Sequence, residues 1–341
     1  MSRSRFLSHS IVRDELSFDA LEAEWTDLFQ RAATKTPFLQ YSWLRLSWQR
    51  QRRERGTKLL VIVVREDDKA VLIAPLVTRP NLVVFQSASF LDSLTPQYND
   101  LIVDQSPYAT EYVDYLWQLL HGIGRLRRLD AMWVRADSQL ARPLLDAKRA
   151  TKATSHKAAI IDLTKFGDWN RYLRNLPKKL RGDHGRQMRN LEKRGVVGFE
   201  LVSSQPCDSN LAWIFDHKRR WIDRVGVQQT WLKALGTEEL YTEAAKEGLK
   251  TGRTWISTLA LNGETLAAML SFREGSTLYM SKIAYDRSWH NYSPGRTLIL
   301  LTIERAFKEG IQRCDLMTGR GELKDALATD HVKVVNRTVW F

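Results

Sequence analysis

The strongest constraint on the fold of this chain is an order of segments that occurs twice. In the first half, apolar runs at residues 58–64 and 70–77 flank a short polar turn, which predicts a β-hairpin. In the second half, residues 254–261 and 264–272 flank Asn262-Gly263, a dipeptide that favours a tight two-residue turn because both positions tolerate positive φ. The same hairpin unit is therefore predicted in both halves.

Each hairpin is followed by the same continuation and preceded by two helical patterns. The continuation is a third extended segment, a helix and a further strand: 82–90, 108–120 and 129–134 in the first half, and 277–285, 296–308 and 313–317 in the second. The preceding helices are predicted at 18–31, 41–50, 213–225 and 237–250. We predict an α/β (α+β) protein of two related domains, 1–150 and 151–341, each a mixed sheet flanked by helices. A linker is expected at 150–156, where Thr, Lys and Ser gather.

The composition supports two packed domains and argues against several other classes. The 341 residues are 43% hydrophobic, which is enough for two cores. No run approaches the ~18 apolar residues of a membrane span, and residues 1–15 lack the apolar centre of a signal peptide, so we expect a cytoplasmic protein. Neither the two cysteines, Cys207 and Cys314, nor the seven histidines have metal-binding spacing. We therefore expect no membrane span and no metal site.

A net charge of +13 predicts an anionic partner, and one segment concentrates that charge. Residues 171–194 hold nine Lys and Arg against two acidic residues. Leu180, Met188 and Leu191 share one side of the helix that this segment predicts, which leaves most of its cations on the other sides. The segment is either a solvated basic helix docked by its apolar stripe or a surface that binds an anion, and both interpretations stay open.

The turn Ser293-Pro294-Gly295-Arg296-Thr297 follows a predicted strand and opens an apolar helix. The first turn of a helix leaves backbone N–H groups without intrahelical partners and carries partial positive charge, so anionic oxygens bind there. Gly295 has no Cβ to keep a pyrophosphate away from the backbone, and Arg296 adds a charged donor. The segment predicts a phosphate site, with an ordinary strand-to-helix loop as the other interpretation.

The order of elements together with this turn resembles the Gcn5-related N-acetyltransferase (GNAT) fold, whose pyrophosphate loop occupies the corresponding place. More narrowly, the chain resembles the BioF2-like group, which includes the CelD-type cellulose biosynthesis proteins and is similar to the Fem peptidyltransferases. The motifs that carry this resemblance are residues 38–43, 74–76, 98–100, 176–195, 278–286, 293–295, 314–319 and Lys324. The family's common Tyr before the C-terminal lysine is Leu323 here, so only the lysine matches.

The resemblance implies transfer of an acyl group, acetyl above all, from a CoA thioester to an amine. The extended segment 277–285 would hold the pantetheine arm by β-type pairing and direct one backbone N–H at the thioester oxygen. The phosphates of acetyl-CoA or another acyl-CoA would rest on the turn before the helix. The residues implied to bind this donor are Ile283, Ala284, Ser293, Gly295, Arg296 and Thr297.

Four side chains are candidates for the chemistry. Asp315, at the end of the strand beside the expected cleft, is the first candidate base for the amine proton, and ordering a loop is its structural alternative. Lys324 is implied to stabilise the developing oxyanion, as the matching lysine in Fem-like enzymes is thought to do, unless it is a solvated surface residue. Tyr279 and Tyr285 are expected on one face of the strand, where either can protonate the leaving thiolate or simply pack.

The two halves are expected to divide the work. The first half has no Pro-Gly phosphate turn, so we expect the second domain to bind the donor and the first to shape the acceptor cleft. The acceptor would be a small-molecule or glycan amine, as in polysaccharide or cell-envelope precursor metabolism. Two other functions stay open: a Fem-like peptidyltransferase that uses aminoacyl-tRNA, with residues 177–194 as its RNA surface, and a non-catalytic basic module that binds nucleic acid or an acidic partner.

Overall fold

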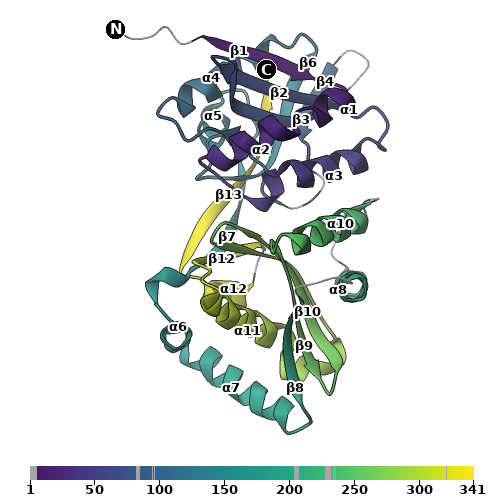
Figure 1. Cartoon of the computed structure of the whole chain (residues 1–341), viewed down its shortest axis with the longest axis vertical. Coiled ribbons are helices and arrows are strands. Elements are labelled where there is room, and N and C mark those ends of the chain that lie inside the picture. Colours follow the sequence, from purple (N-terminus) through teal and green to yellow (C-terminus); the bar gives the residue numbers. More distant parts are fainter. Residues whose placement is uncertain are drawn as a thin grey trace. The chain divides into compact units, whose positions relative to one another are not determined.

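The computed structural model describes residues 6–81, 85–93, 95, 97–202, 207–226, 232, 234, 236–319 and 321–341. The chain folds into two compact units, the first comprising Met1–His156 together with Val332–Phe341 and the second comprising Lys157–His331. Each unit is a mixed sheet with helices on its faces (Figure 1).

The sheet of the first unit contains one parallel pair among antiparallel neighbours. Its strands run in the order β1-β2-β3-β4-β6-β13, and β5 pairs with β3. The parallel pair is β4 with β6, which the helix α4 connects. The strands are β1 Leu7–Val12, β2 Lys58–Glu66, β3 Lys69–Asn81, β4 Phe85–Phe90, β5 Ile102–Val103, β6 Leu126–Arg135 and β13 Asp330–Trp340. The helices are α1 Glu15–Asp19, α2 Glu22–Arg31, η1 Pro37–Leu39, α3 Tyr41–Gln51, α4 Ala109–Gly122 and α5 Ala141–Asp146.

The sheet of the second unit has the order β7-β12-β11-β10-β9-β8. Its parallel pair is β11 with β12, which the helix α11 connects. The strands are β7 Thr154–Asp162, β8 Val197–Val202, β9 Thr254–Leu261, β10 Glu264–Glu274, β11 Thr277–Tyr285 and β12 Arg313–Thr318. The helices are η2 Leu163–Lys165, α6 Trp169–Asn175, α7 Lys178–Glu192, α8 Asp208–Val225, α10 Thr237–Lys250, η3 Arg287–Tyr292, α11 Pro294–Lys308 and α12 Glu322–Leu327.

The repeated order predicted from the sequence is confirmed. In each unit a hairpin leads through a third strand and a helix to a strand that lies parallel to the third, as β2-β3-β4-α4-β6 and as β9-β10-β11-α11-β12. The second hairpin turns at Asn262 and Gly263, whose φ angles of 50° and 85° are in the left-handed region that this turn requires. The two units are therefore variations on one α/β plan.

Two details of the division differ from the prediction. Residues 154–156, expected in a linker, begin strand β7, which continues into the buried residues 158–161. The last ten residues, expected in the second domain, belong to the first unit because β13 pairs with β6 from Val334 to Trp340. Residues 82–84 of the strand predicted at 82–90 lie outside the described residues.

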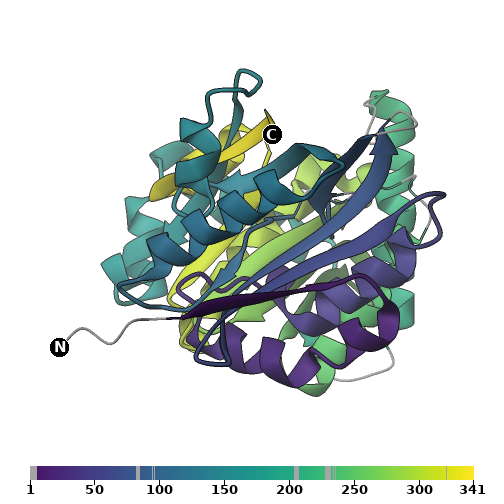
Figure 2. The ribbon, with the colours of Figure 1, turned by 90° about the horizontal axis from the view of Figure 1, so that it is seen from above.

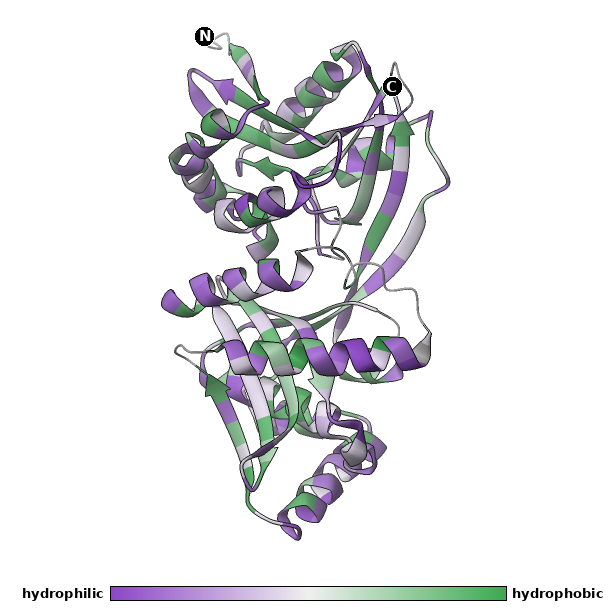
Figure 3. Cartoon of the chain, turned by 90° about the vertical axis from the view of Figure 1, so that its right-hand side faces the viewer, coloured by the Kyte–Doolittle hydropathy of each residue, from purple (hydrophilic) through white to green (hydrophobic). Residues whose placement is uncertain are grey.

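Helices cover both faces of each sheet. In the first unit α4 packs on one face of β2 and β3, and α2 packs on the other (Figure 2). In the second unit α11 lies on one side of β9 and β10, and α8 and α10 lie on the other (Figure 1). Green residues recur along the strands, and most helices carry both green and purple residues when coloured by hydropathy (Figure 3), as expected for amphipathic helices packed on a sheet.

Helix α11 is anchored by its apolar side. Leu298, Ile303 and Ala306 are fully buried in a cluster that also contains Leu259 of β9 and Met269 of β10. This packing fixes the position of the helix, and therefore of its N-terminus, relative to the sheet. None of the helices among the described residues combines the length and apolar character needed to cross a bilayer.

Candidate active site

Strands β11 and β12 of the second unit separate after a short paired stretch. They pair in parallel only from Thr277 opposite Arg313 to Tyr279 opposite Asp315. On its other side β11 stays paired with β10 as far as Tyr285. In the part of the chain that the structure describes, no strand pairs with the β12 side of β11 beyond Tyr279. The separation leaves an open backbone edge, which an extended ligand can occupy by β-type pairing.

A β-bulge lies where this open edge begins. Met280 is opposite Ser271 and Lys282 is opposite Leu270, so Ser281 is an extra residue in β11. The extra residue shifts the side-chain alternation of β11 by one position. The face to which odd-numbered side chains of β11 point before the bulge is therefore the face to which even-numbered side chains point after it.

The bulge overturns one expectation about the candidate tyrosines. Tyr279 is opposite Phe272 and Tyr285 is opposite Ala267, and two residues five apart on β10 point to opposite faces. The prediction that Tyr279 and Tyr285 share a face is therefore wrong, because Ser281 breaks the alternation between them. Tyr279 is 6% exposed and packs inside, whereas Tyr285 is 41% exposed.

Beyond the bulge, one hydrogen bond shows which backbone groups face the open edge. The Asp286 N–H donates to the Leu266 carbonyl at 2.8 Å. Since antiparallel pairs alternate between hydrogen-bonded and non-hydrogen-bonded residues, Ala284 also directs its backbone groups to β10, whereas Ile283 and Tyr285 direct theirs to the opening. Of the two amides expected to face a thioester oxygen, it is that of Ile283 which points to the open edge.

Helix α11 begins directly beside this edge. Ser293, the residue before the helix, has a left-handed backbone with φ of 47°, and Pro294 is the first helical residue. Gly295 lies so close to Tyr285 that a Cβ at this position would be 3.2 Å from the ring atom Cδ1. The missing side chain thus brings the first turn of the helix against the end of β11.

The other two residues of the turn have different surroundings. Thr297 is 1% exposed, and its N–H donates to the Ser293 carbonyl at 3.1 Å, so this amide is already used within the helix. The Arg296 guanidinium lies 3.5 Å from the Asp183 carboxylate of α7. Helix α7, the predicted basic helix, is thereby docked against the start of α11. The amides of Gly295 and Arg296 belong to the first turn of α11, where N–H groups have no intrahelical partner.

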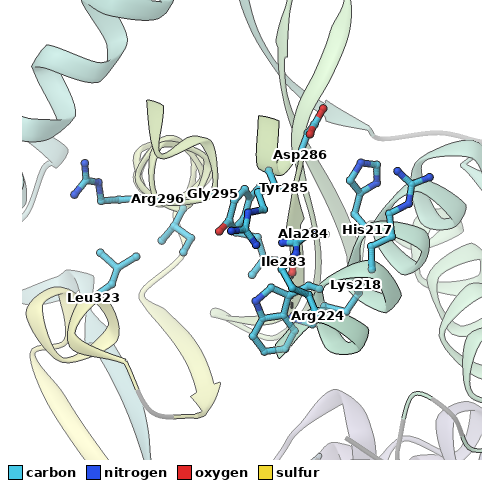
Figure 4. A pocket seen from close by; sticks show the side chains of 14 residues that line it. His217, Lys218, Arg224, Ile283, Ala284, Tyr285, Asp286, Gly295, Arg296 and Leu323 are labelled. Atoms are coloured by element: carbon cyan, nitrogen blue, oxygen red, sulfur yellow. Dashed lines mark hydrogen bonds between the residues drawn. The ribbon is translucent and has the colours of Figure 1, made fainter. Parts of the chain in front are cut away.

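A pocket of about 410 Å³ lies between β11, the first turn of α11 and helix α8 (Figure 4). Its apolar lining comes from β11, α11 and α12, and its cationic lining comes mainly from α8. Figure 4 shows Gly295 on one side of β11 and the side chains of α8 on the other. The lining residues are His217, Lys218, Arg220, Trp221, Arg224, Ile283, Ala284, Tyr285, Asp286, Arg287, Gly295, Arg296, Ile299 and Leu323.

Helix α8 supplies pocket residues that the sequence did not single out. The Lys218 Nζ donates to the Ile283 carbonyl at 3.3 Å and lies 5.0 Å from the centre of the Trp221 ring. Burial lowers the pKa of Lys218. The available signal was the recurrence of His217, Trp221 and Arg224 at spacings of four and three, which places them on one side of a helix.

Asp315 holds the backbone where β12 turns away from β11. Its carboxylate is 1% exposed and accepts the Met317 N–H at 2.7 Å. Met317 has φ of 59°, an uncommon conformation for a residue with a side chain of this size. Asp315 thus has the ordering role that was its structural alternative, at the mouth of the strand separation.

Lys324 closes the carboxyl end of β12. Its ammonium donates to the carbonyls of Leu316 and Thr318 at 2.7 and 2.9 Å, and a Cβ on Gly319 would lie only 3.1 Å from its nitrogen. Burial lowers the pKa of Lys324 to about 8, an effect that Asp315 opposes. Lys324 is therefore not a solvated surface residue.

The sequence profile of the acetyltransferase (GNAT) domain family matches residues 178–325. This range contains β11, the turn before α11, β12 and Lys324. The second unit is thus similar to GNAT domains over most of its length, and this similarity supports an acyltransferase. A comparison with curated proteins finds no match.

Solved structures with the same fold extend over both units. FemX has a TM-score of 0.62 at 11% identity, over 95% of this chain and 96% of that chain. The C-terminal domain of a putative lysylphosphatidylglycerol synthetase from Agrobacterium fabrum has a TM-score of 0.56 at 10% identity, over 94% and 92%. L-PGS from Bacillus licheniformis has a TM-score of 0.52 at 9% identity, over 93% and 90%. At these identities the likeness to the three structures concerns the fold alone.

Proposed function

We propose that the second unit transfers an acyl group, acetyl above all, from a CoA thioester to an amine. The observation that carries this proposal is the open edge of β11, which runs past Ile283 and ends against the first turn of α11 at Gly295. A pantetheine arm paired along this edge would bring its pyrophosphate to the helix start. The same arm would bring its thioester toward the Ile283 amide.

The transfer then needs two proton movements. The amine attacks the thioester carbon, a C–N bond forms, and the Ile283 N–H stabilises the oxyanion. Asp315 takes the proton that the amine loses, directly or through a water. The C–S bond breaks as the oxyanion collapses, and Tyr285, exposed in the pocket, protonates the CoA thiolate. Lys324 holds the end of β12 in place and adds positive charge beside the oxyanion, and Tyr279 packs next to Asp315 in the paired part of the strands.

Asp315→Asn separates the catalytic from the ordering role of this carboxylate. The amide keeps an oxygen for the Met317 N–H but has no basicity, so we expect kcat to fall by about 100-fold or more. The Kd of acetyl-CoA, measured by calorimetry, should stay unchanged.

Asp315→Ala is the matched variant, since it removes both the base and the acceptor of the Met317 N–H. It should lower kcat to the same extent and also lower the melting temperature. A wild-type kcat in Asp315→Asn would restrict Asp315 to ordering the backbone.

The first unit is proposed to shape the acceptor side. Its α4 starts after Ser106-Pro107 without the glycine that Gly295 provides in the second unit. An amine of a polysaccharide or cell-envelope precursor fits the resemblance to the BioF2-like and CelD-type group. A binding titration of acetyl-CoA that gives one site per chain supports this division, and two sites would contradict it.

Aminoacyl-tRNA is a second candidate donor, because the basic helix α7 is docked beside the donor helix. Its exposed cations are Lys178, Lys179, Arg186 and Arg189, followed by Lys193 and Arg194. The helix is predominantly purple in Figure 3. Gln187 on its inner side donates to the Asn291 carbonyl at 3.1 Å, just before α11. An RNA strand on α7 would thus have its end near the pocket.

Charge reversal at Lys178, Lys179 and Arg181 distinguishes the two donors. If RNA binds, its apparent affinity falls steeply with salt, with a log–log slope of about −0.7 per neutralised phosphate of a single strand. The triple variant should then have a shallower slope, measured by filter binding of bulk tRNA. Acetyl-CoA turnover that is unchanged in this variant supports the CoA donor. If the triple variant loses the protein's function while variants of Gly295 and Asp315 keep it, the non-catalytic binding module is the better account.

A further inference from the structure

The pocket of the second unit is cationic on the side of α8 and of the turn after β11. Lys218 and Arg224 from α8 and Arg287 after β11 line this side. Asp286 is the one carboxylate among the described lining residues, and it accepts the Ser288 N–H at 2.9 Å. Arg220, also on this side, pairs with Asp216 at 2.8 Å.

Three of these cations have no carboxylate partner among the described residues. Lys218, Arg224 and Arg287 form no ion pair within 4.0 Å in that part of the chain, in contrast to Arg220 and Arg296. Lys218 bears the cost of burial without an opposing charge, and the pKa of its ammonium is lowered for this reason alone. Uncompensated cations around a pocket with apolar walls attract and hold an anion.

The donor phosphates have a different place in the proposed complex. They rest on Gly295 and Arg296, which lie across β11 from the side chains of α8 (Figure 4). Lys218 instead contacts the carbonyl of Ile283, the residue whose amide is proposed to face the thioester oxygen. The amine must approach the thioester at this point. A charged group on the acceptor would then lie within reach of Lys218 and of the two arginines.

We infer that the acceptor amine carries an anionic group, a phosphate or a carboxylate, which Lys218, Arg224 and Arg287 bind. This inference rests on the proposed function, because it assigns the α8 side of the pocket to the acceptor of that reaction. It narrows the acceptor from amines in general to acidic amines.

Matched pairs of amines test the inference. CoA release from acetyl-CoA is measured with ethanolamine and phosphoethanolamine, with glucosamine and glucosamine 6-phosphate, and with cadaverine and lysine. We expect the acidic member of at least one pair to have a kcat/KM at least about tenfold higher. Arg224→Gln combined with Arg287→Gln should abolish that preference, chiefly through KM, and leave the Kd of acetyl-CoA within about twofold of wild type. Arg305→Gln, an exposed residue on α11 outside the pocket, is the matched control.

Two results would overturn the inference and leave the proposed function standing. One is a wild-type enzyme that turns over neutral and acidic amines equally. The other is a tenfold or greater loss of acetyl-CoA affinity in the double variant, which would assign the arginines to the donor. If acetyl-CoA does not bind at all, the proposed function fails. Phosphoethanolamine binding to the wild type is then measured from the change in tryptophan fluorescence, with Trp221→Phe as the control. If phosphoethanolamine does not bind, the inference is overturned.

Discussion

Gly295→Trp should abolish the binding of acetyl-CoA. A Cβ at residue 295 would already lie 3.2 Å from the Tyr285 ring, and an indole would fill the space between the first turn of α11 and β11. The amides of that turn would then be out of reach of a pyrophosphate. Hydrogen bonds to a charged group are worth about 1.5–3 kcal/mol each. Losing two of them predicts a Kd higher by at least about 100-fold in isothermal titration calorimetry.

Gly182→Trp is the matched control for this prediction. Gly182 is an exposed residue of α7, and a Cβ there would have no neighbour within 4 Å. This variant should bind acetyl-CoA like the wild type. Equal affinity in the wild type and Gly295→Trp, or no binding by either, would remove the donor site from the second unit. Retained circular dichroism in Gly295→Trp shows that the loss is local.

The stability of the protein should rise with pH above 8 because of Lys324. Burial lowers the pKa of its ammonium from 10.5 to about 8 in the folded state. Between these values the unfolded chain binds more protons than the folded chain, so the free energy of unfolding increases with pH. The difference between the two pKa values corresponds to about 3 kcal/mol. Below pH 8 both states are protonated, and the folded state bears the full cost of burying the charge.

Lys324→Met isolates this contribution. We compare the free energy of unfolding of the wild type and the variant, measured with urea at pH 7.5, 9 and 10.5. These pH values cover the range between the folded and unfolded pKa values of about 8 and 10.5. The stability gap is the difference between the two free energies at each pH. That gap should shift in favour of the wild type by up to about 3 kcal/mol across the series. Lys308→Met removes an exposed lysine of α11 whose side chain is 66% accessible, and its gap should stay flat. If the stability gap between the wild type and Lys324→Met is also independent of pH, the Lys324 ammonium is solvated in the folded protein.

The sequence is sufficient for the repeated plan because each element carries a local signal. The hairpin at Asn262-Gly263 needs two positions with positive φ. The first position of α11 is occupied by Pro294, which suits it because a backbone N–H there would have no intrahelical partner. Both signals depend on a few neighbouring residues. The pairing of β7 and β13 is not visible in the sequence, because the polar residues 154–157 resemble a linker and the partner strands of both lie far away in the chain.

The site is less predictable because its geometry depends on distant partners. The bulge at Ser281 is visible only in the pairing of β11 with β10, and it alone decides that Tyr279 and Tyr285 point to opposite faces. Lys324 reaches the carbonyls at the end of β12 because Gly319 leaves room for its nitrogen. Lys218 enters the pocket from a helix 65 positions earlier in the chain than Ile283. No local pattern of residues contains these contacts.

The return of the chain through β13 has a consequence for biosynthesis. Residues 332–341 are synthesised after the whole second unit, yet they complete the sheet of the first unit. The second unit is thus inserted in the sequence of the first and can pair its own strands during translation, whereas one edge of β6 in the first unit stays unpaired until residues 332–341 have been made. A deletion of residues 332–341 spares every residue proposed for catalysis and removes the strand that pairs with β6 of the first unit.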